Sequence, residues 1–301
     1  MQAEPAHTHT HTHTHTSVLL EEALEALQPR GGTGFRALDC TLGAGGHAFG
    51  LLERSSPDGQ LVGLDADPAA LELARARLAP FGERASFLRS NFGDLADLGL
   101  EPMNAIVFDL GLSSMQLETS GRGFSFRVDE PLDMRFDPDG DEPSAAELLN
   151  TLGEAELERI LKDNGEEPRA RRVAREIVRR RPLQRTGELV GAVTAALGPA
   201  RGRAHPATRT FQALRIAVND ELGALERGLD GGVRLLRPGG RIAVISFHSL
   251  EDRIVKWRFR GWAEQGLARV LTRKPVRPSA TEAADNPRAR SAKLRVAERS
   301  P

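Results

Sequence analysis

Short apolar runs, each bounded by glycine, proline or polar residues, alternate with amphipathic segments between residues 17 and 110, as is typical of buried strands joined by helices. We predict four strands, at residues 35–40, 61–65, 85–91 and 103–110. Helical spacing of apolar positions predicts helices at residues 17–24, 47–54 and 68–78. Ser17 is the expected N-cap of the first helix, and Pro68 fits the first turn of the third. The alternation indicates a parallel, doubly wound α/β sheet.

The alternation stops between Met115 and Ala207. Only loops and helices are predicted there, most clearly helices at residues 154–162 and 170–181, the second ended by Pro182. An inserted, mainly helical domain that recognises the substrate therefore interrupts the α/β domain. We place a leader at residues 1–16, the α/β domain at 17–118 and 207–301, and the insert at 119–206.

The strand pattern resumes after the insert. Apolar residues recur every three or four positions between residues 211 and 229, which predicts one long helix facing the core. The Pro-Gly-Gly turn at residues 238–240 should end that unit, and residues 241–247 form a fifth buried strand. Ser249 is the expected N-cap of the next helix, because Asp252 three positions later completes a variant of the capping box.

Charge is balanced over the whole chain but segregated along it. The 301 residues carry a formal net charge of -1 at pH 7. Eleven acidic residues and one arginine lie in 129–158, twelve arginines and four glutamates in 165–215, and nine basic and three acidic residues in 269–299. Basic segments of this kind are typical of a nucleic-acid footprint, although arginines on a helix are often only solvated. We expect a local contact with nucleic acid rather than general binding to polyanions.

Cysteine content and hydropathy limit the class of protein further. The single cysteine, Cys40, excludes a disulfide framework, and its place beside a glycine-rich turn indicates packing. We find no signal peptide or long apolar span, so we expect a soluble, cytoplasmic protein without membrane contact. The His-Thr repeat of the leader is of low complexity and is expected to be disordered. It would bind Ni²⁺ or Zn²⁺ only adventitiously, so no functional metal is expected.

The most informative stretch is a strand that ends in the glycine-rich turn Thr41-Leu42-Gly43-Ala44-Gly45-Gly46-His47. Glycine lacks a Cβ and tolerates positive φ, so backbone there can approach a ligand closely. Asp65 ends the next strand 22 positions after Gly43, near the offset of an acidic residue that binds ribose hydroxyls. Asp39, before the turn, would repel a pyrophosphate but could hold a cationic amino-acid tail. A nucleoside cofactor is predicted, and S-adenosylmethionine fits better than NAD because the spacing lacks the third glycine of G-x-G-x-x-G.

Two further strand ends carry polar groups. In doubly wound sheets the ligand crevice lies beyond the carboxyl ends of the strands. Asp109 follows a strongly apolar run, so its carboxylate needs a partner, either a cofactor group, a substrate amine or its own loop. His248 could bind substrate, relay a proton or bond the backbone of a tight turn. Glu251 is explained by the helix dipole alone.

Two segments combine rings with arginines. The first suits stacking of an unpaired base and binding of phosphate, through Arg122, Phe124 and Phe126. The second is a basic loop before the helix at residue 208, and it offers Arg203, His205 and Arg209 to phosphates. A solvated loop is the alternative in both cases. These six residues are the candidate RNA-binding residues.

The set of motifs closely resembles one family, the ribosomal RNA small subunit methyltransferase H family, also called MraW. The similarity extends from His15 to Arg299. Besides the glycine-rich turn, the most specific motifs are Asp109-Leu110-Gly111-Leu112-Ser113-Ser114, Arg122-Gly123-Phe124-Ser125-Phe126 and Phe247-His248-Ser249-Leu250-Glu251-Asp252. Cys40 and the His-Thr leader depart from the family pattern, and neither lies in the inferred site.

The resemblance implies a Rossmann-like class I methyltransferase sheet and transfer of a methyl group from S-adenosyl-L-methionine to N4 of a cytidine in 16S ribosomal RNA. It implies cofactor contacts from Gly45, Gly46, His47, Asp65, Phe92, Asp109 and Gln116. A cytosine amine is a poor nucleophile, so a group that accepts its proton should help, and Asp109 and His248 are the candidate catalytic residues. The expected partner is 16S rRNA or the small ribosomal subunit, and the sequence leaves open whether the chain is a monomer or a homodimer.

Three other functions fit part of the pattern. An NAD-dependent oxidoreductase fits the sheet but not the glycine spacing. A non-catalytic RNA-binding factor for ribosome assembly, with the cofactor as a structural ligand, fits the basic insert. A DNA amino-methyltransferase shares the chemistry, but those enzymes usually carry a Pro-Pro pair and an aromatic residue where this chain has Asp109-Leu110-Gly111-Leu112.

Overall fold

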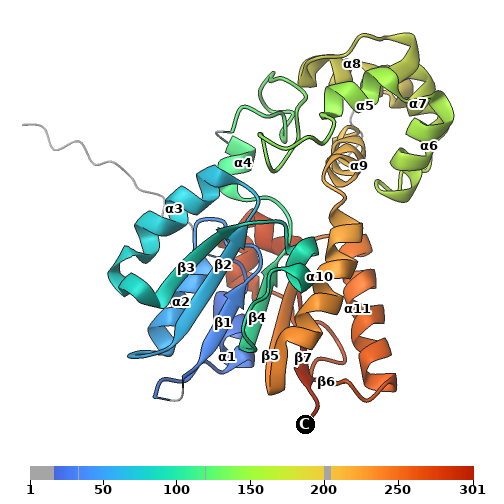
Figure 1. Cartoon of the computed structure of the whole chain (residues 1–301). Helices are drawn as coiled ribbons and strands as arrows, with labels where there is room; N and C mark the ends of the chain where they lie inside the picture. Colours follow the sequence, from blue (N-terminus) through green and yellow to red (C-terminus); the bar gives the residue numbers. More distant parts are fainter. Residues whose placement is uncertain (1–16, 33, 119, 200–204) are drawn as a thin grey trace, which may run out of the picture.

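A computed structural model describes residues 17–32, 34–118, 120–199 and 205–301. The chain forms an α/β layer and a helical insert above the carboxyl ends of its strands (Figure 1). The His-Thr leader and Arg203, a candidate RNA-binding residue, lie outside the described residues. No helix in the described part combines the length and the apolar character that a membrane crossing needs.

One seven-stranded sheet has the order β3-β2-β1-β4-β5-β7-β6. Its strands are β1 Arg36–Asp39, β2 Gln60–Asp65, β3 Ala85–Arg89, β4 Met103–Asp109, β5 Leu236–Ser246, β6 Ala268–Val270 and β7 Lys293–Arg299. The first five are parallel, and β7 lies antiparallel between β5 and β6. The predicted parallel, doubly wound sheet is confirmed. The strand order reverses between β1 and β4, and a ligand crevice is expected at that point.

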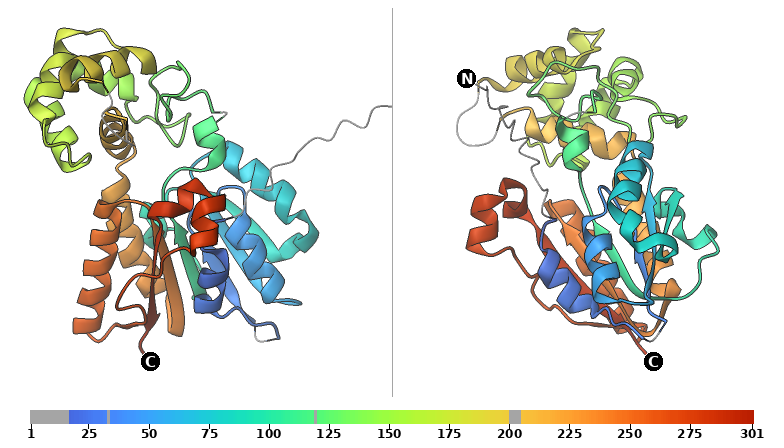
Figure 2. Two further views of the ribbon diagram at one scale, coloured as in Figure 1. Left: turned by 180° about the vertical axis from the view of Figure 1, so that it is seen from behind. Right: turned by 90° about the vertical axis from the view of Figure 1, so that its left-hand side faces the viewer.

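The apolar strand β4 shows how the sheet is buried on both faces. Side chains alternate along a strand, so Ala105 and Val107 join one core and Ile106 and Phe108 the other. The first core is covered by α1 (Leu20–Leu27), α2 (Gly46–Arg54) and α3 (Pro68–Leu78), and the second by α10 (Glu221–Leu235) and α11 (Ser249–Glu264). Figure 2 shows these helices on the two sides of the sheet. The short segments are η1 (Ala79–Arg84), η2 (Phe92–Asp97), α12 (Ala280–Asp285) and η3 (Pro287–Ser291).

The insert has a hydrophobic core of its own. Its helices, together with the helix that leads back to the sheet, are α4 Ser114–Glu118, α5 Ala145–Thr151, α6 Glu154–Asp163, α7 Ala170–Arg179, α8 Thr186–Leu197 and α9 Thr208–Val218. Helix α9 packs in this core through Phe211 and Leu214. As predicted, the described residues between Met115 and Ala207 form no strand, and Pro131 and Arg185 make a single isolated bridge. The domain boundaries at residues 119 and 206 stay predictions.

One expected long helix is two helices. The chain breaks at Asn219 and Asp220, and Asp220 has a left-handed φ of 45°, which aspartate tolerates better than most residues. The Asn219 amide donates to the carbonyl of Met134, and its Oδ1 accepts from Phe136 N–H at 2.7 Å. The apolar spacing continues across the break, so the hydrophobic pattern alone could not reveal it.

Both predicted N-caps were wrong, and β5 is longer than expected. Helix α1 begins after Leu19, whose N–H is bound by Glu282 from far along the chain, so Ser17 is not its cap. Helix α11 is capped one residue earlier than Ser249, by His248. Strand β5 contains the Pro-Gly-Gly turn at residues 238–240 as an irregularity in its pairing with β4, rather than starting after it. Strands β6 and β7 were not predicted.

Candidate active site

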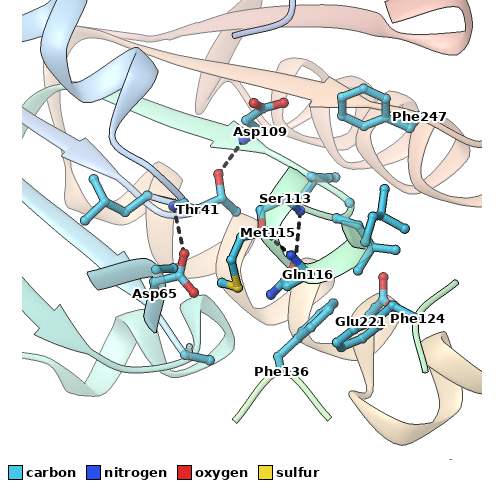
Figure 3. Close-up of a pocket in the computed structure, with 18 of the residues that line it drawn as sticks. Thr41, Asp65, Asp109, Ser113, Met115, Gln116, Phe124, Phe136, Glu221 and Phe247 are labelled. Atoms are coloured by element: carbon cyan, nitrogen blue, oxygen red, sulfur yellow. Dashed lines mark hydrogen bonds between the residues drawn. The ribbon is translucent and has the colours of Figure 1, made fainter. Parts of the chain in front are cut away.

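A cleft of about 600 Å³ opens where the strand order reverses. Its floor is built by the segments that follow β1, β2, β4 and β5, and its roof by the insert. In Figure 3, Asp65 and Thr41 lie on the side of the sheet, Phe124 and Phe136 come from the insert, and Gln116 lies between them. The cleft therefore brings together the sequence-predicted cofactor segments and one of the two predicted RNA segments.

The glycine-rich turn has the backbone that its composition predicts. Gly43 and Gly45 have φ values of 51° and 75°, in the left-handed region that favours glycine. At Gly46 a Cβ would lie 1.8 Å from the Ser17 hydroxyl oxygen, so a side chain would force that segment away. Helix α2 starts at Gly46, and Gly46 and His47 of its first turn line the cleft, whereas the Ala48 N–H is bound by Asp39.

Asp65 lies at the carboxyl end of β2, as predicted. Its Oδ2 accepts from Gly43 N–H at 2.8 Å and its Oδ1 from Asp67 N–H at 2.9 Å, which fixes the carboxylate beside the turn. Burial raises the pKa of Asp65 to about 6. Each oxygen keeps a second lone pair, so a ribose diol can donate to it.

Phe92 and Gln116 complete the predicted cofactor side. The Phe92 ring packs edge to face on Phe108 at 5.6 Å and lines the cleft. Gln116 is 7% exposed, accepts from Ser113 N–H at 3.0 Å and donates to Asp67 Oδ2 at 3.4 Å. Six of the seven predicted cofactor residues line the cleft, and Gly45 does not, since a Cβ there would contact Leu78 and Ala74 of α3.

Asp39 does not lie where the sequence led us to expect it. It is 1% exposed and is not among the residues that line the cleft. Its carboxylate instead accepts from Thr41 N–H at 3.1 Å and so holds the turn from beneath. The expectation that Asp39 faces a cationic tail was therefore wrong. The reason is its depth in the sheet, since Asp39 pairs with Val107, two residues before Asp109 on the same face, and so lies beneath the turn.

Asp39→Asn is expected to stabilise the protein without cofactor at alkaline pH. Burial raises the pKa of Asp39 to about 7 from 3.8, so the folded state binds this proton more tightly than the unfolded chain. That stabilisation is complete below pH 3.8 and is lost as the pH rises through 7. Asparagine keeps the acceptor for Thr41 and removes the charge. We expect the free energy of unfolding in urea to rise by about 1–3 kcal/mol at alkaline pH and to stay unchanged in acid. An equal gain at both extremes would contradict the titration.

Asp109 and His47 form a pair beside the turn, in which the His47 side chain is buried and that of Asp109 is 24% exposed. The Asp109 Oδ2 lies 3.4 Å from His47 Nδ1, and Asp109 N–H donates to the Thr41 hydroxyl at 2.6 Å. His47 Nε2 is 3.2 Å from the Val18 carbonyl, which only accepts, so Nε2 carries the proton. Burial lowers the pKa of His47 to about 4, so Nδ1 is an unprotonated acceptor at neutral pH.

The shared proton therefore lies on Asp109. Burial, then the charges of Asp39 and Glu251, raise the pKa of Asp109 well above its usual range. Its other oxygen, Oδ1, is buried and has no hydrogen-bond partner among the described residues. An unpaired buried oxygen is costly, and it belongs to a residue that lines a cleft able to hold a ligand.

A second polar cluster, missed by the sequence reasoning, lines the cleft where β5 ends. Glu251 is 3% exposed, and its Oε2 accepts from Phe247 N–H at 2.7 Å and His248 N–H at 3.1 Å, so the helix dipole does not account for it alone. Arg215 donates to both oxygens of Glu221, at 2.6 and 2.9 Å. The capping-box spacing of His248 and Glu251 was the available signal. Nothing in the sequence indicated that the ion pair across the α9–α10 break joins them.

Three side chains of this cluster carry atoms of the kind that bind metals. The potential metal-ligand atoms of Glu221, His248 and Glu251 lie within 4.8 Å of one another. Arg215 already binds both oxygens of Glu221 and supplies a positive charge there. Arg215 therefore offsets one of the two carboxylate charges in the cluster.

The predicted RNA-binding residues divide between the cleft and the surface. The ring of Phe124 stacks on that of Phe136, with 5.7 Å between the ring centroids, and the ring of Phe126 stacks on that of His205, with 4.8 Å between the centroids. Both phenylalanines line the cleft, whereas Arg209 is exposed on α9. Arg122 is largely buried, and its guanidinium binds the Asp67 carboxylate and the carbonyls of Arg135 and Phe136. RNA contact by these residues stays a prediction.

The fold and the cleft together define a Rossmann-like class I methyltransferase. The sheet has parallel strands with one antiparallel strand between β5 and β6, and one cleft is lined by a glycine-rich turn and acidic strand ends. More particularly, the chain belongs to the MraW methylase family, whose sequence model matches residues 12–300.

Two relatives are similar over nearly their whole length. A ribosomal RNA small subunit methyltransferase H from Symbiobacterium thermophilum is 51% identical over 305 residues, covering 93% of this chain and 94% of its own. A protein of the same name from Geobacter sulfurreducens is 52% identical over 309 residues, covering 94% and 97%. A solved rRNA methylase from Streptococcus thermophilus is 11% identical, covers 94% of each chain and has a TM-score of 0.44, a level from which nothing about the site follows.

Proposed function

We propose that this protein transfers a methyl group from S-adenosylmethionine to the exocyclic amine N4 of a cytidine in 16S ribosomal RNA. The printed names of its relatives support the substrate class. The observation that carries the proposal is the unpaired, buried Oδ1 of Asp109 in a cleft between the glycine-rich turn and the aromatic roof. One group able to accept a proton thus lies where the two substrates would meet.

The residues present fit the cofactor. Gly46 leaves no room for a side chain, and Gly45 and His47 flank it at the start of α2, so backbone N–H groups can face a carboxylate. Asp65 can bind the ribose, and Phe92 can cover an edge of the adenine. When bound, S-adenosylmethionine supplies an electrophilic methyl group on a positively charged sulfur.

Asp109 changes its protonation when a cation binds beside it. Without ligand Asp109 holds a proton, since burial raises its pKa, and its Oδ2 lies 3.4 Å from the unprotonated Nδ1 of His47. A nearby positive charge favours the ionised carboxylate, which is a stronger acceptor. Oδ1 can then accept a hydrogen bond from the cytosine amine and take its proton, an effect typically of about 10²- to 10⁴-fold on rate.

The RNA side of the cleft is aromatic. A base must leave its stack to reach a buried carboxylate, and Phe124 and Phe126 offer surfaces on which it can stack. His205 supports Phe126, and Arg209 on the exposed side of α9 can contact phosphates. We expect the enzyme to act in the cytoplasm on 16S rRNA or on the small subunit.

Methyl incorporation tests the function directly. Purified protein with radiolabelled S-adenosylmethionine and unmodified small subunits should label one cytidine in 16S rRNA, and mass spectrometry should place the methyl group on N4. Binding of the cofactor without labelling would favour an assembly factor. Binding of NADH in its place would favour an oxidoreductase, and labelling of DNA but not of rRNA a DNA amino-methyltransferase.

A further inference from the structure

His248 has one ring nitrogen that is hydrogen-bonded and one that is buried without a hydrogen-bond partner among the described residues. Its Nδ1 accepts the Glu251 N–H at 3.4 Å, as the side chain that caps α11. Nδ1 is therefore unprotonated, and the ring proton is on Nε2. Nε2 lies 3.0 Å from Glu251 Oε1, but without the alignment of a hydrogen bond. Among the described residues, Nε2 is a buried donor without a hydrogen-bonded partner.

Its neighbours hold this imidazole in one orientation. The Glu251 carboxylate is fixed by the backbone of Phe247 and His248 and lies against the ring. Glu221, anchored by Arg215, closes the other side of the cluster. Glu251 and the Arg215–Glu221 pair are positioning residues, because they set the orientation of a group that itself faces the cleft.

Two residues that line one cavity therefore each carry a buried, unpartnered polar atom, and the two atoms are of opposite character. Strands β4 and β5 are paired beside the cleft, with Asp109 opposite Ile245 and Leu110 N–H donating to Ile245 at 3.0 Å. His248 follows three residues after Ile245, so it lies on the strand end next to that of Asp109. Asp109 Oδ1 accepts, and His248 Nε2 donates.

We propose that this pair is a reading site for the edge of a pyrimidine, in which His248 Nε2–H donates to N3 of the target cytosine while Asp109 Oδ1 accepts from N4. Cytosine presents a donor at N4 beside an acceptor at N3, whereas uracil presents the reverse. In uracil, the N3–H donor would meet His248 Nε2–H, and the O4 acceptor would meet Asp109 Oδ1. The proposal rests on the proposed function and gives His248 a role in base selection instead of acceptance of the amine's proton.

The test removes the N3 acceptor from the RNA and leaves the protein unchanged. Small-subunit RNA is assembled by ligation with either cytidine or 3-deazacytidine at the methylated position. With the unaltered enzyme, 3-deazacytidine should reduce kcat/KM by about 10- to 100-fold, because a buried donor loses its partner. Two variants, His248→Ala and His248→Gln, are assayed on both RNAs.

His248→Ala should lose about the same factor on cytidine, and 3-deazacytidine should cost it nothing more, since the two changes remove one hydrogen bond. His248→Gln should recover most of the activity on cytidine, because its amide N–H replaces Nε2–H, and should stay sensitive to 3-deazacytidine. The cofactor Kd should be equal in all three proteins. Additive losses, or an unaltered enzyme indifferent to 3-deazacytidine, would overturn the proposal. Failure of the unaltered enzyme to methylate cytidine at all would instead refute the proposed function.

Discussion

Asp109→Asn is expected to slow methyl transfer by about 10²- to 10⁴-fold, the usual contribution of a positioned proton acceptor. Asparagine has nearly the same shape and keeps an oxygen beside the cleft, but it cannot take a proton. Asp109 is already protonated without ligand, because burial raises its pKa, so asparagine adds no charge beside Asp39 and Glu251. We therefore expect the variant to fold at least as stably as the parent, so that the loss reflects chemistry.

Asp109 is also a predicted cofactor contact, so two measurements are needed. Calorimetry gives the Kd for S-adenosylmethionine, and single-turnover rates at saturating cofactor give the methyl-transfer step. Asp97→Asn is the matched control, because Asp97 is exposed on η2 and lies outside the cleft. A weakened Kd with an unchanged single-turnover rate would show that Asp109 binds the cofactor and takes no part in proton transfer.

The central sheet could be predicted because the local sequence of each strand reflects how deeply that strand is buried. The run Met103–Asp109 is apolar at nearly every position, as required of a strand buried on both faces. The turn at Gly43 and Gly45 could be predicted in the same way, since a positive φ favours glycine whatever residues surround it. Asp65 followed from its place at a strand end.

What escaped prediction depends on contacts between distant parts of the chain. Strand β6 has three residues, and β7 alternates apolar and charged positions that also suit a solvated segment. Asp39 and Asp109 both end apolar strands, yet one supports the turn and the other faces the cleft. That difference follows from the register of β1 and β4, because Asp39 pairs with Val107, two residues before Asp109. The local sequence does not show this register.

The polar cluster around His248 shows the same limit within the site. Glu251 could be placed on the first turn of a helix, but its burial depends on the insert and on α10. Arg215 and Glu221 are six residues apart across a helix break that the apolar spacing conceals. Their joint position became visible only with the fold.

Arg122→Met is expected to lower the free energy of unfolding by about 3–5 kcal/mol, because it leaves a buried carboxylate without its counter-charge. Asp67 is 1% exposed, caps α3 by accepting Ala69 N–H at 3.1 Å and is the partner of the Arg122 guanidinium. Methionine keeps most of the apolar stem, so the loss reports the charge. Urea unfolding measures it, and Asp67→Asn combined with Arg122→Met should restore part of the stability.

Exposed Arg127 offers the matched control, since Arg127→Met should change stability by less than about 0.5 kcal/mol. The salt dependence of RNA binding then separates the two roles of Arg122. If Arg122 contacts a phosphate, its replacement should lower the slope of log K for RNA binding against log salt concentration by about 1. If Arg122 only joins the insert to the cofactor side through an ion pair, the slope should stay unchanged. Because the guanidinium is already bound by Asp67 and two carbonyls, we expect an unchanged slope. A variant as stable as the parent with a reduced slope would show that Arg122 is a phosphate contact and that the buried pair adds nothing to folding.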